Sequence, residues 1–134
     1  MSKVQQVAVW TFLWCFWSFM SRNNHPTLFI DLIATGLMLA CFAAVVYFNW
    51  LVLVPRFWYR RQFGLYWLCL AFASCALTAA VVVLIQEVYD MLWGPDLLRF
   101  GFWVNYGLDF TGMMVHLALA ALVVRLVHRR PTSA

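Results

Sequence analysis

The chain has 134 residues, of which 66% are hydrophobic, 19% are aromatic and 10% are charged, and its formal net charge is +4. Soluble domains are about 45–50% apolar and about 25% charged, so this chain has too little polar surface to cover a globule in water. The same composition excludes a disordered chain, a nucleic-acid-binding module and a disulfide-stapled secreted domain. We expect the chain to lie in a lipid bilayer.

Long stretches without charge predict the helices of the chain. Residues 4–21, 32–55 and 62–86 carry no charged side chain, and Asp109 is the only charged residue in 100–124. A helix that crosses a membrane needs about 20 mostly apolar residues. The sequence therefore predicts an all-α, polytopic membrane protein whose single domain, 1–134, contains four transmembrane helices over about 5–21, 29–54, 64–87 and 101–126.

The first predicted helix, 5–21, has an aromatic face. Its apolar run ends in Trp17-Ser18-Phe19-Met20-Ser21, without the small residues of a signal-peptide cleavage site, so we expect the helix to be retained. Trp10, Trp14 and Trp17 are spaced i, i+4 and i+7 and share one face. We expect this face to contact a partner or lipid, with packing inside the chain as the alternative, and a quinone or pigment site is less expected.

The second and third helices are expected to pack as a hairpin. Small residues let membrane helices approach closely, and the second helix has them at four-residue spacing. The predicted contact joins Gly36, Ala40 and Ala44 to Ala71, Cys75 and Ala79. Pro55 is predicted to close the second helix, because proline lacks the backbone donor that a helix needs.

Polar residues recur on one face of the fourth helix. Asn105, Asp109, Gly112 and His116 follow one another at steps of four, three and four residues. A carboxylate inside a membrane costs about 2.5–3.5 kcal/mol on insertion scales, so it is expected to face the bundle or water. Asn105, Asp109 and His116 are therefore the candidate intramembrane polar site, either for a ligand, ion or proton or for a hydrogen bond between helices.

Neither the cysteines nor the histidines predict a cofactor. The four cysteines lie inside predicted helices without a C-x-x-C motif, which favours packing over metal binding. The three histidines lie at different depths, whereas a bis-histidine haem needs two axial ligands at one depth. We expect no cofactor within one chain, although a single-histidine site or one shared with another subunit stays open.

Basic residues predict the orientation in the membrane. One side of a four-helix topology collects seven of the nine basic residues, namely Lys3, Arg56, Arg60, Arg61, Arg125, Arg129 and Arg130. The other side has only Arg22 and Arg99. Lys and Arg accumulate on the cytoplasmic side, so both termini are expected to be cytoplasmic, in a multi-pass protein of a bacterial inner membrane.

The turn between the second and third helices resembles a known family. Residues 47–57 read Tyr-Phe-Asn-Trp-Leu-Val-Leu-Val-Pro-Arg-Phe, and a basic turn and Tyr66 follow. This run of about twenty residues resembles the N-terminal membrane domain of LytS-type sensor histidine kinases, through Asn49, Pro55, Arg56 and Tyr66. In those kinases the fourth helix leads to a phospho-accepting histidine and an ATP-binding domain. Here His128 does not lie in such a motif, so the resemblance implies a sensory module without the enzyme.

Two functions therefore stand, and neither is enzymatic. The first is a sensor-like, non-catalytic membrane module that acts through a protein partner or a homo-oligomer. The alternative is a structural or accessory subunit of a larger respiratory or photosynthetic membrane complex. A transporter is the third possibility, but small four-helix transporters usually have a carboxylate in the first helix and this chain has none. No nucleophile motif, phosphate loop or metal cluster in the sequence supports catalysis.

Overall fold

The computed structural model describes residues 2–94 and 101–128, and within these ranges the chain forms only helices. In chain order they are α1 (Lys3–Ser21), the 3₁₀ turn η1 (Arg22–Asn24), α2 (Leu28–Phe48), the π-helical segment η2 (Asn49–Trp58), α3 (Phe63–Leu92) and α4 (Phe102–His128). The all-helical class is confirmed. Asp96, Arg99, Arg129 and Arg130 lie outside the described residues.

Three of the helices are long and apolar enough to cross a membrane. They are Leu28–Trp58, which joins α2 to η2, then Phe63–Leu92 and Phe102–Leu126. The helix α1 has 19 residues and does not belong to this group. The chain thus has the helices of a multi-pass membrane protein by length and composition.

Side-chain caps begin the first two long helices. In α1, Ser2 Oγ accepts from the Gln5 amide at 3.2 Å, and Gln5 Oε1 accepts from the Ser2 amide at 2.9 Å. In α2, Thr27 Oγ1 accepts from the Ile30 amide at 3.3 Å. Such caps satisfy backbone donors that have no partner inside the helix, so the helix starts are determined locally.

Pro55 does not close the second helix where the sequence predicted. The chain continues through it as the π-helical segment η2, Asn49–Trp58. The Tyr59 amide donates to Val54 O at 3.2 Å and the Gln62 amide to Phe57 O at 3.0 Å, both five residues back. A proline ring clashes with the carbonyl four residues before it, and the wider π turn relieves that clash while the helix goes on.

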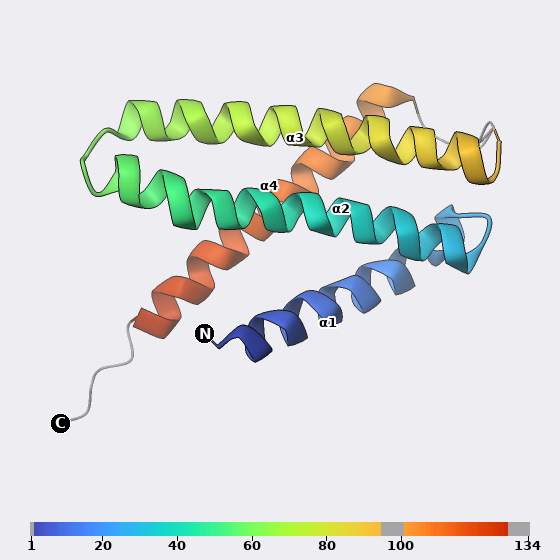
Figure 1. Cartoon of the computed structure of the whole chain (residues 1–134), viewed down its shortest axis with the longest axis horizontal. Helices are drawn as coiled ribbons and strands as arrows, with labels where there is room; N and C mark the ends of the chain where they lie inside the picture. Colours follow the sequence, from blue (N-terminus) through green and yellow to red (C-terminus); the bar gives the residue numbers. More distant parts are fainter. Residues whose placement is uncertain (1, 95–100, 129–134) are drawn as a thin grey trace.

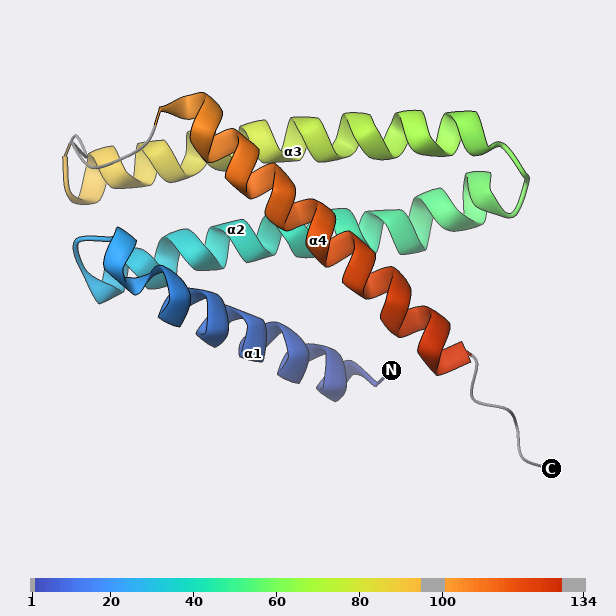
Figure 2. The same ribbon diagram turned by 180° about the vertical axis from the view of Figure 1, so that it is seen from behind.

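The helices form an antiparallel hairpin of α2 and α3, with α1 and α4 on one side of it (Figure 1). The helix α1 runs back along α2, whereas α4 crosses the hairpin diagonally (Figure 2). The start of α4 lies by the end of α3, and its last turns lie beyond α2. We call the end of the bundle that carries the α1–α2 turn the turn end. At this end α1 lies next to α2, whereas α4 lies next to α3 (Figure 2).

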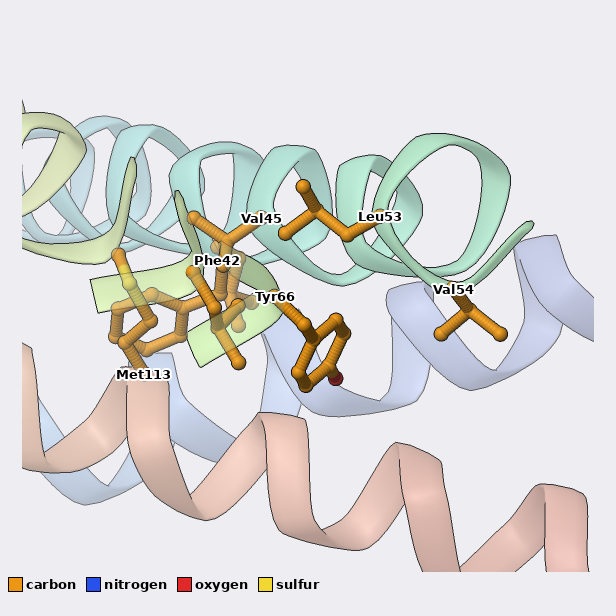
Figure 3. Close-up of a cluster of buried hydrophobic side chains, with 8 residues drawn as sticks. Phe42, Val45, Leu53, Val54, Tyr66 and Met113 are labelled. Carbon is orange, nitrogen blue, oxygen red and sulfur yellow. The ribbon is translucent and has the colours of Figure 1, made fainter. Parts of the chain in front are cut away.

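The core lies where α4 crosses the hairpin. Phe42 and Val45 of α2 and Met113 of α4 are each 0% exposed, and Tyr66 of α3 belongs to the same cluster (Figure 3). A second cluster nearer the turn end joins Ile30 and Ala34 of α2 to Val81, Ile85 and Tyr89 of α3. These two clusters fix the hairpin over most of its length.

The predicted small-residue contact between α2 and α3 is wrong. Ala40, Ala44, Ala71 and Cys75 are exposed on the outside of the hairpin. The buried face of α3 carries Ser74 and Thr78 instead, each 0% exposed. The contact between α2 and α3 therefore uses other residues than the predicted stripe.

Candidate functional site

A cavity of about 910 Å³ opens at the turn end of the bundle. Its walls come from the end of α1, the α1–α2 turn, the first half of α2, the end of α3 and the first half of α4. Such a volume is typical of sites for small organic molecules, which are about 300–1,000 Å³. We call it the turn-end cavity. It is the candidate functional site of the described part of the chain.

The polar face of α4 supplies one wall of the turn-end cavity. Asn105, Asp109 and Gly112 line it, and Thr111 adds a hydroxyl group. Asn105 and Asp109 are half-buried. The structure therefore brings two of the three residues of the candidate polar site to the surface of one cavity.

His116, the third residue of that site, is 5% exposed and does not line the cavity. Its Nδ1 lies 2.7 Å from Gly112 O, and its Nε2 accepts from Trp17 Nε1 at 3.3 Å. A carbonyl oxygen can only accept, so Nδ1 carries the proton and the imidazole is the neutral Nδ1–H tautomer.

Aromatic rings hold His116 on two sides. Its ring centroid is 4.8 Å from that of Phe42 and 5.9 Å from that of Trp17. Both ring nitrogens are engaged, which leaves no lone pair for a metal or haem iron. Among the described residues there is also no group of three or more His, Cys, Asp or Glu side chains placed to hold a metal ion. His116 therefore packs behind Trp17, Phe42 and Gly112, which line the cavity.

Asp31, which is not one of the predicted site residues, is the fully buried carboxylate among the described residues, at 0% exposed. It lies in the first turn of α2, behind the cavity wall made by Ser21, His25 and Thr35. Ser21 Oγ donates to Asp31 Oδ1, and Thr35 Oγ1 does so at 3.3 Å. His25 Nε2 lies 3.5 Å from the same oxygen.

The second oxygen of Asp31, Oδ2, has no hydrogen-bond partner among the described residues. A buried carboxylate normally accepts at both oxygens, because an unsatisfied buried acceptor is costly. The sequence did contain one signal for this site. Thr35 follows Asp31 by four residues on the same helix face, but the proximity of Ser21 and His25 follows only from the α1–α2 turn.

The aromatic face of α1 is directed at the rest of the chain. Trp10 Nε1 donates to Tyr47 OH at 3.0 Å, Trp14 Nε1 to Leu32 O at 3.0 Å, and Trp17 Nε1 to His116. A buried indole N–H usually needs such a partner. The three tryptophans thus pack inside the chain, which is the alternative to the expected contact with a partner or lipid, although Trp14 stays 42% exposed.

Two residues of the family-like motif bind each other. Tyr66 OH donates to Asn49 Oδ1 at 2.8 Å, and both residues are 7% exposed. Pro55 lies one turn further along the π-helical segment. Arg56 is exposed at the end of the bundle opposite the turn end, with its guanidinium carbon 5.9 Å from the Phe57 ring centroid. These residues are far from the turn-end cavity and organise the α2–α3 turn.

The cysteines are unpaired thiols. Cys15 and Cys75 are exposed, and Cys41 and Cys69 are half-buried. Cys41 Sγ donates to Leu77 O at 3.3 Å across the α2–α3 contact.

Comparisons of the chain with protein-family models, with curated proteins and with solved structures find no match.

Proposed function

We propose that the chain is a non-catalytic, multi-pass module of a bacterial inner membrane that binds a small ligand in the turn-end cavity and acts through a protein partner. The observation that carries this proposal is the cavity of about 910 Å³ with Asn105 and Asp109 of α4 in its wall. A cavity with a few polar groups in a mostly apolar lining is the usual form of a ligand site. The resemblance to the membrane domain of LytS-type kinases points to the same class.

The proposed topology has four spans with both termini in the cytoplasm. Support for α1 as a span comes from its contacts with α2, which run from Ser21–Asp31 to Gln6–Tyr47. These contacts cover 16 residues of α2, or about 24 Å at 1.5 Å per residue. The outward face of α1 is apolar, with Val7, Phe12 and Phe19 more than half exposed. Such a helix is suited to lipid contact at the depth of α2.

In this topology the turn-end cavity faces the outside of the cell. Arg56, Arg60, Arg61 and Arg125 are at or near the opposite end of the bundle, which the positive-inside rule places in the cytoplasm. The helix α4 connects the two sides. Asp109 and Arg125 are 16 residues apart on it, about 24 Å along the axis. A ligand that moves the cavity wall would therefore move the cytoplasmic end of the same rigid helix.

Native mass spectrometry after gentle detergent extraction tests the proposal. A sensor-like module is expected as a monomer, a homodimer or a complex with one signalling protein in fixed ratio. Recovery as a stoichiometric subunit of a large respiratory or photosynthetic complex would contradict it and support the accessory-subunit alternative. As a second readout, Asp109→Asn is expected to change the response of the host cell without lowering the amount of protein in the membrane.

A further inference from the structure

We propose that the turn-end cavity binds a monovalent organic cation with an apolar body. This inference rests on the proposed function, because it names the class of ligand that the same cavity would bind. The charges, the aromatic lining and the size of the cavity each bear on the ligand class.

The charges around the cavity favour a cation. Asp109 lines the wall from α4, and Asp31 lies directly behind Ser21 and Thr35 of the opposite wall. Among the described residues that line the cavity there is no lysine or arginine, and His25 is the only basic side chain. Arg22 is directed to the outer surface of α1, with its guanidinium carbon 4.1 Å from the Phe19 ring centroid. Among the described residues Asp109 is the one carboxylate in the lining, and Asp31 lies behind the lining at 0% exposed, 3.5 Å from His25 Nε2. An anion in the cavity would be repelled by Asp109 at close range.

Aromatic rings make up much of the remaining wall. Three helices contribute these rings: Trp17 belongs to α1, Phe42 to α2, and Tyr89 and Trp93 to the end of α3. The faces of such rings carry partial negative charge and attract cations, and quaternary ammonium groups are typically bound by aromatic side chains. The combination of rings and carboxylates matches an organic ammonium ion better than a neutral apolar ligand.

The size and the donor set argue against a bare metal ion. About 910 Å³ is far more than one ion needs, and the described residues provide no cluster of three metal-ligating side chains. Hard cations are bound by six or more oxygen ligands, or keep several waters. The ligand is therefore expected to fill space with an apolar body and to place one positive charge near Asp109.

Calorimetric titration of the full chain in nanodiscs tests the charge preference directly. The probe is benzyltrimethylammonium, with neopentylbenzene as its neutral isostere and phenylacetate as an anion, and empty nanodiscs are subtracted. We expect the cation to bind about tenfold more tightly than the neutral isostere, and the anion to bind more weakly than either, because attraction between the carboxylates and the cation acts on the cation alone. Equal affinity for the cation and the isostere would overturn the proposal.

Two matched variants locate the site. Asp109→Asn keeps the shape of the side chain but removes its charge, and it is expected to weaken cation binding about tenfold. Asp90→Asn is the matched control, because Asp90 is exposed outside the cavity and accepts from Gln86 at 3.2 Å. Its affinity for the cation is expected to stay within about twofold of that of the unmodified chain. Unchanged binding in Asp109→Asn would overturn the site assignment.

A third variant covers the case in which Asp109→Asn does not fold. Tyr89→Leu removes a ring from the cavity wall and is expected to reduce binding of the cation more than binding of the isostere. Binding and assembly are measured separately, so the two proposals can fail separately. Absence of cation binding together with sensor-type assembly would overturn only the ligand class, whereas cation binding by a subunit of a large complex would overturn only the proposed function.

Discussion

Tyr66 on α3 donates a 2.8 Å hydrogen bond to the side-chain oxygen of Asn49, and both residues are buried at the base of the α2–α3 hairpin. The pair joins the residue that begins the π-helical segment to the start of the next helix. Trp58, at the end of that segment, packs edge-on against Tyr66 with ring centroids 5.2 Å apart. The basic turn is thus held on both sides by one tyrosine.

Removing this hydrogen bond is expected to destabilise the hairpin. Tyr66→Phe keeps the ring and its contact with Trp58, but it leaves Asn49 Oδ1 buried without its donor. Hydrogen bonds between membrane helices are worth about 0.6 kcal/mol on average and up to about 1.7 kcal/mol. A double-mutant cycle with Asn49→Leu, followed by SDS titration from mild detergent, measures the coupling. Strictly additive losses would contradict a direct interaction.

The crossing of α4 over α2 is expected to depend on Gly112. A Cβ atom at this position would lie 3.0 Å from Phe42 Cζ and 3.2 Å from Cε2, so Gly112→Ala should force the helices apart and cost about 1–3 kcal/mol in the free energy of unfolding. Gly107→Ala is the matched control on the same helix, because no atom lies within 4 Å of its added methyl group.

The same crossing offers a rescue test. If the clash with Phe42 causes the loss, Phe42→Leu should restore part of the stability of Gly112→Ala, although it is destabilising by itself. The measurement is the unfolding midpoint of the four proteins in one detergent. Alanine favours the helix at both positions, so an equal change in stability for Gly112→Ala and Gly107→Ala would contradict a specific contact with Phe42.

The tautomer of His116 is a direct consequence of its two partners. We expect ¹⁵N NMR of the protein in micelles to show a neutral imidazole protonated at Nδ1, which donates to Gly112 O. Trp17→Phe removes the donor at Nε2 and is expected to shift the Nε2 resonance and leave Nδ1 protonated. Trp14→Phe, whose indole donates to Leu32 O instead, should leave both resonances in place. A protonated Nε2 in the unmodified chain would contradict this assignment.

Asp31 is expected to stabilise the junction of α1 and α2. Asp31→Ala would leave the hydroxyl groups of Ser21 and Thr35 without their buried acceptor, at a cost of about 1–3 kcal/mol. Asp31→Asn retains an acceptor oxygen and should cost less. Asp90→Ala, at an exposed position, is expected to change the unfolding free energy by less than about 0.5 kcal/mol. A loss at Asp31 no larger than that at Asp90 would exclude this structural role.

Reporter fusions test the proposed topology. Green fluorescent protein fused at either end of the chain or after Gln62 should fluoresce, because these points are expected in the cytoplasm. Alkaline phosphatase should be active when fused after Trp93, at the end of α3. Activity of a phosphatase fused at the N-terminus, together with a cytoplasmic C-terminus, would show that α1 does not cross the membrane.

Several features could be read from single segments of the sequence. The apolar stretches correctly predicted the positions of the long helices, because helix formation in an apolar environment depends on the local run of residues. The spacing of Asn105 and Asp109 likewise predicted one polar face, because a helix repeats every 3.6 residues. Pro55 was misread, since a π turn tolerates proline where an α-helix would end.

Hydropathy and charge determined by themselves that this chain is helical and has helices long and apolar enough to cross a membrane, since both properties can be read from one segment at a time. Only the tertiary structure decided which faces meet. It turned Trp10, Trp14 and Trp17 toward other helices, left Ala40 and Ala44 on the outside, and buried Asp31 beside Ser21 and His25. The reason is physical. A lipid-exposed helix is apolar all round, so its sequence does not mark which side is buried. The buried side is determined by contacts between residues that are far apart in the chain.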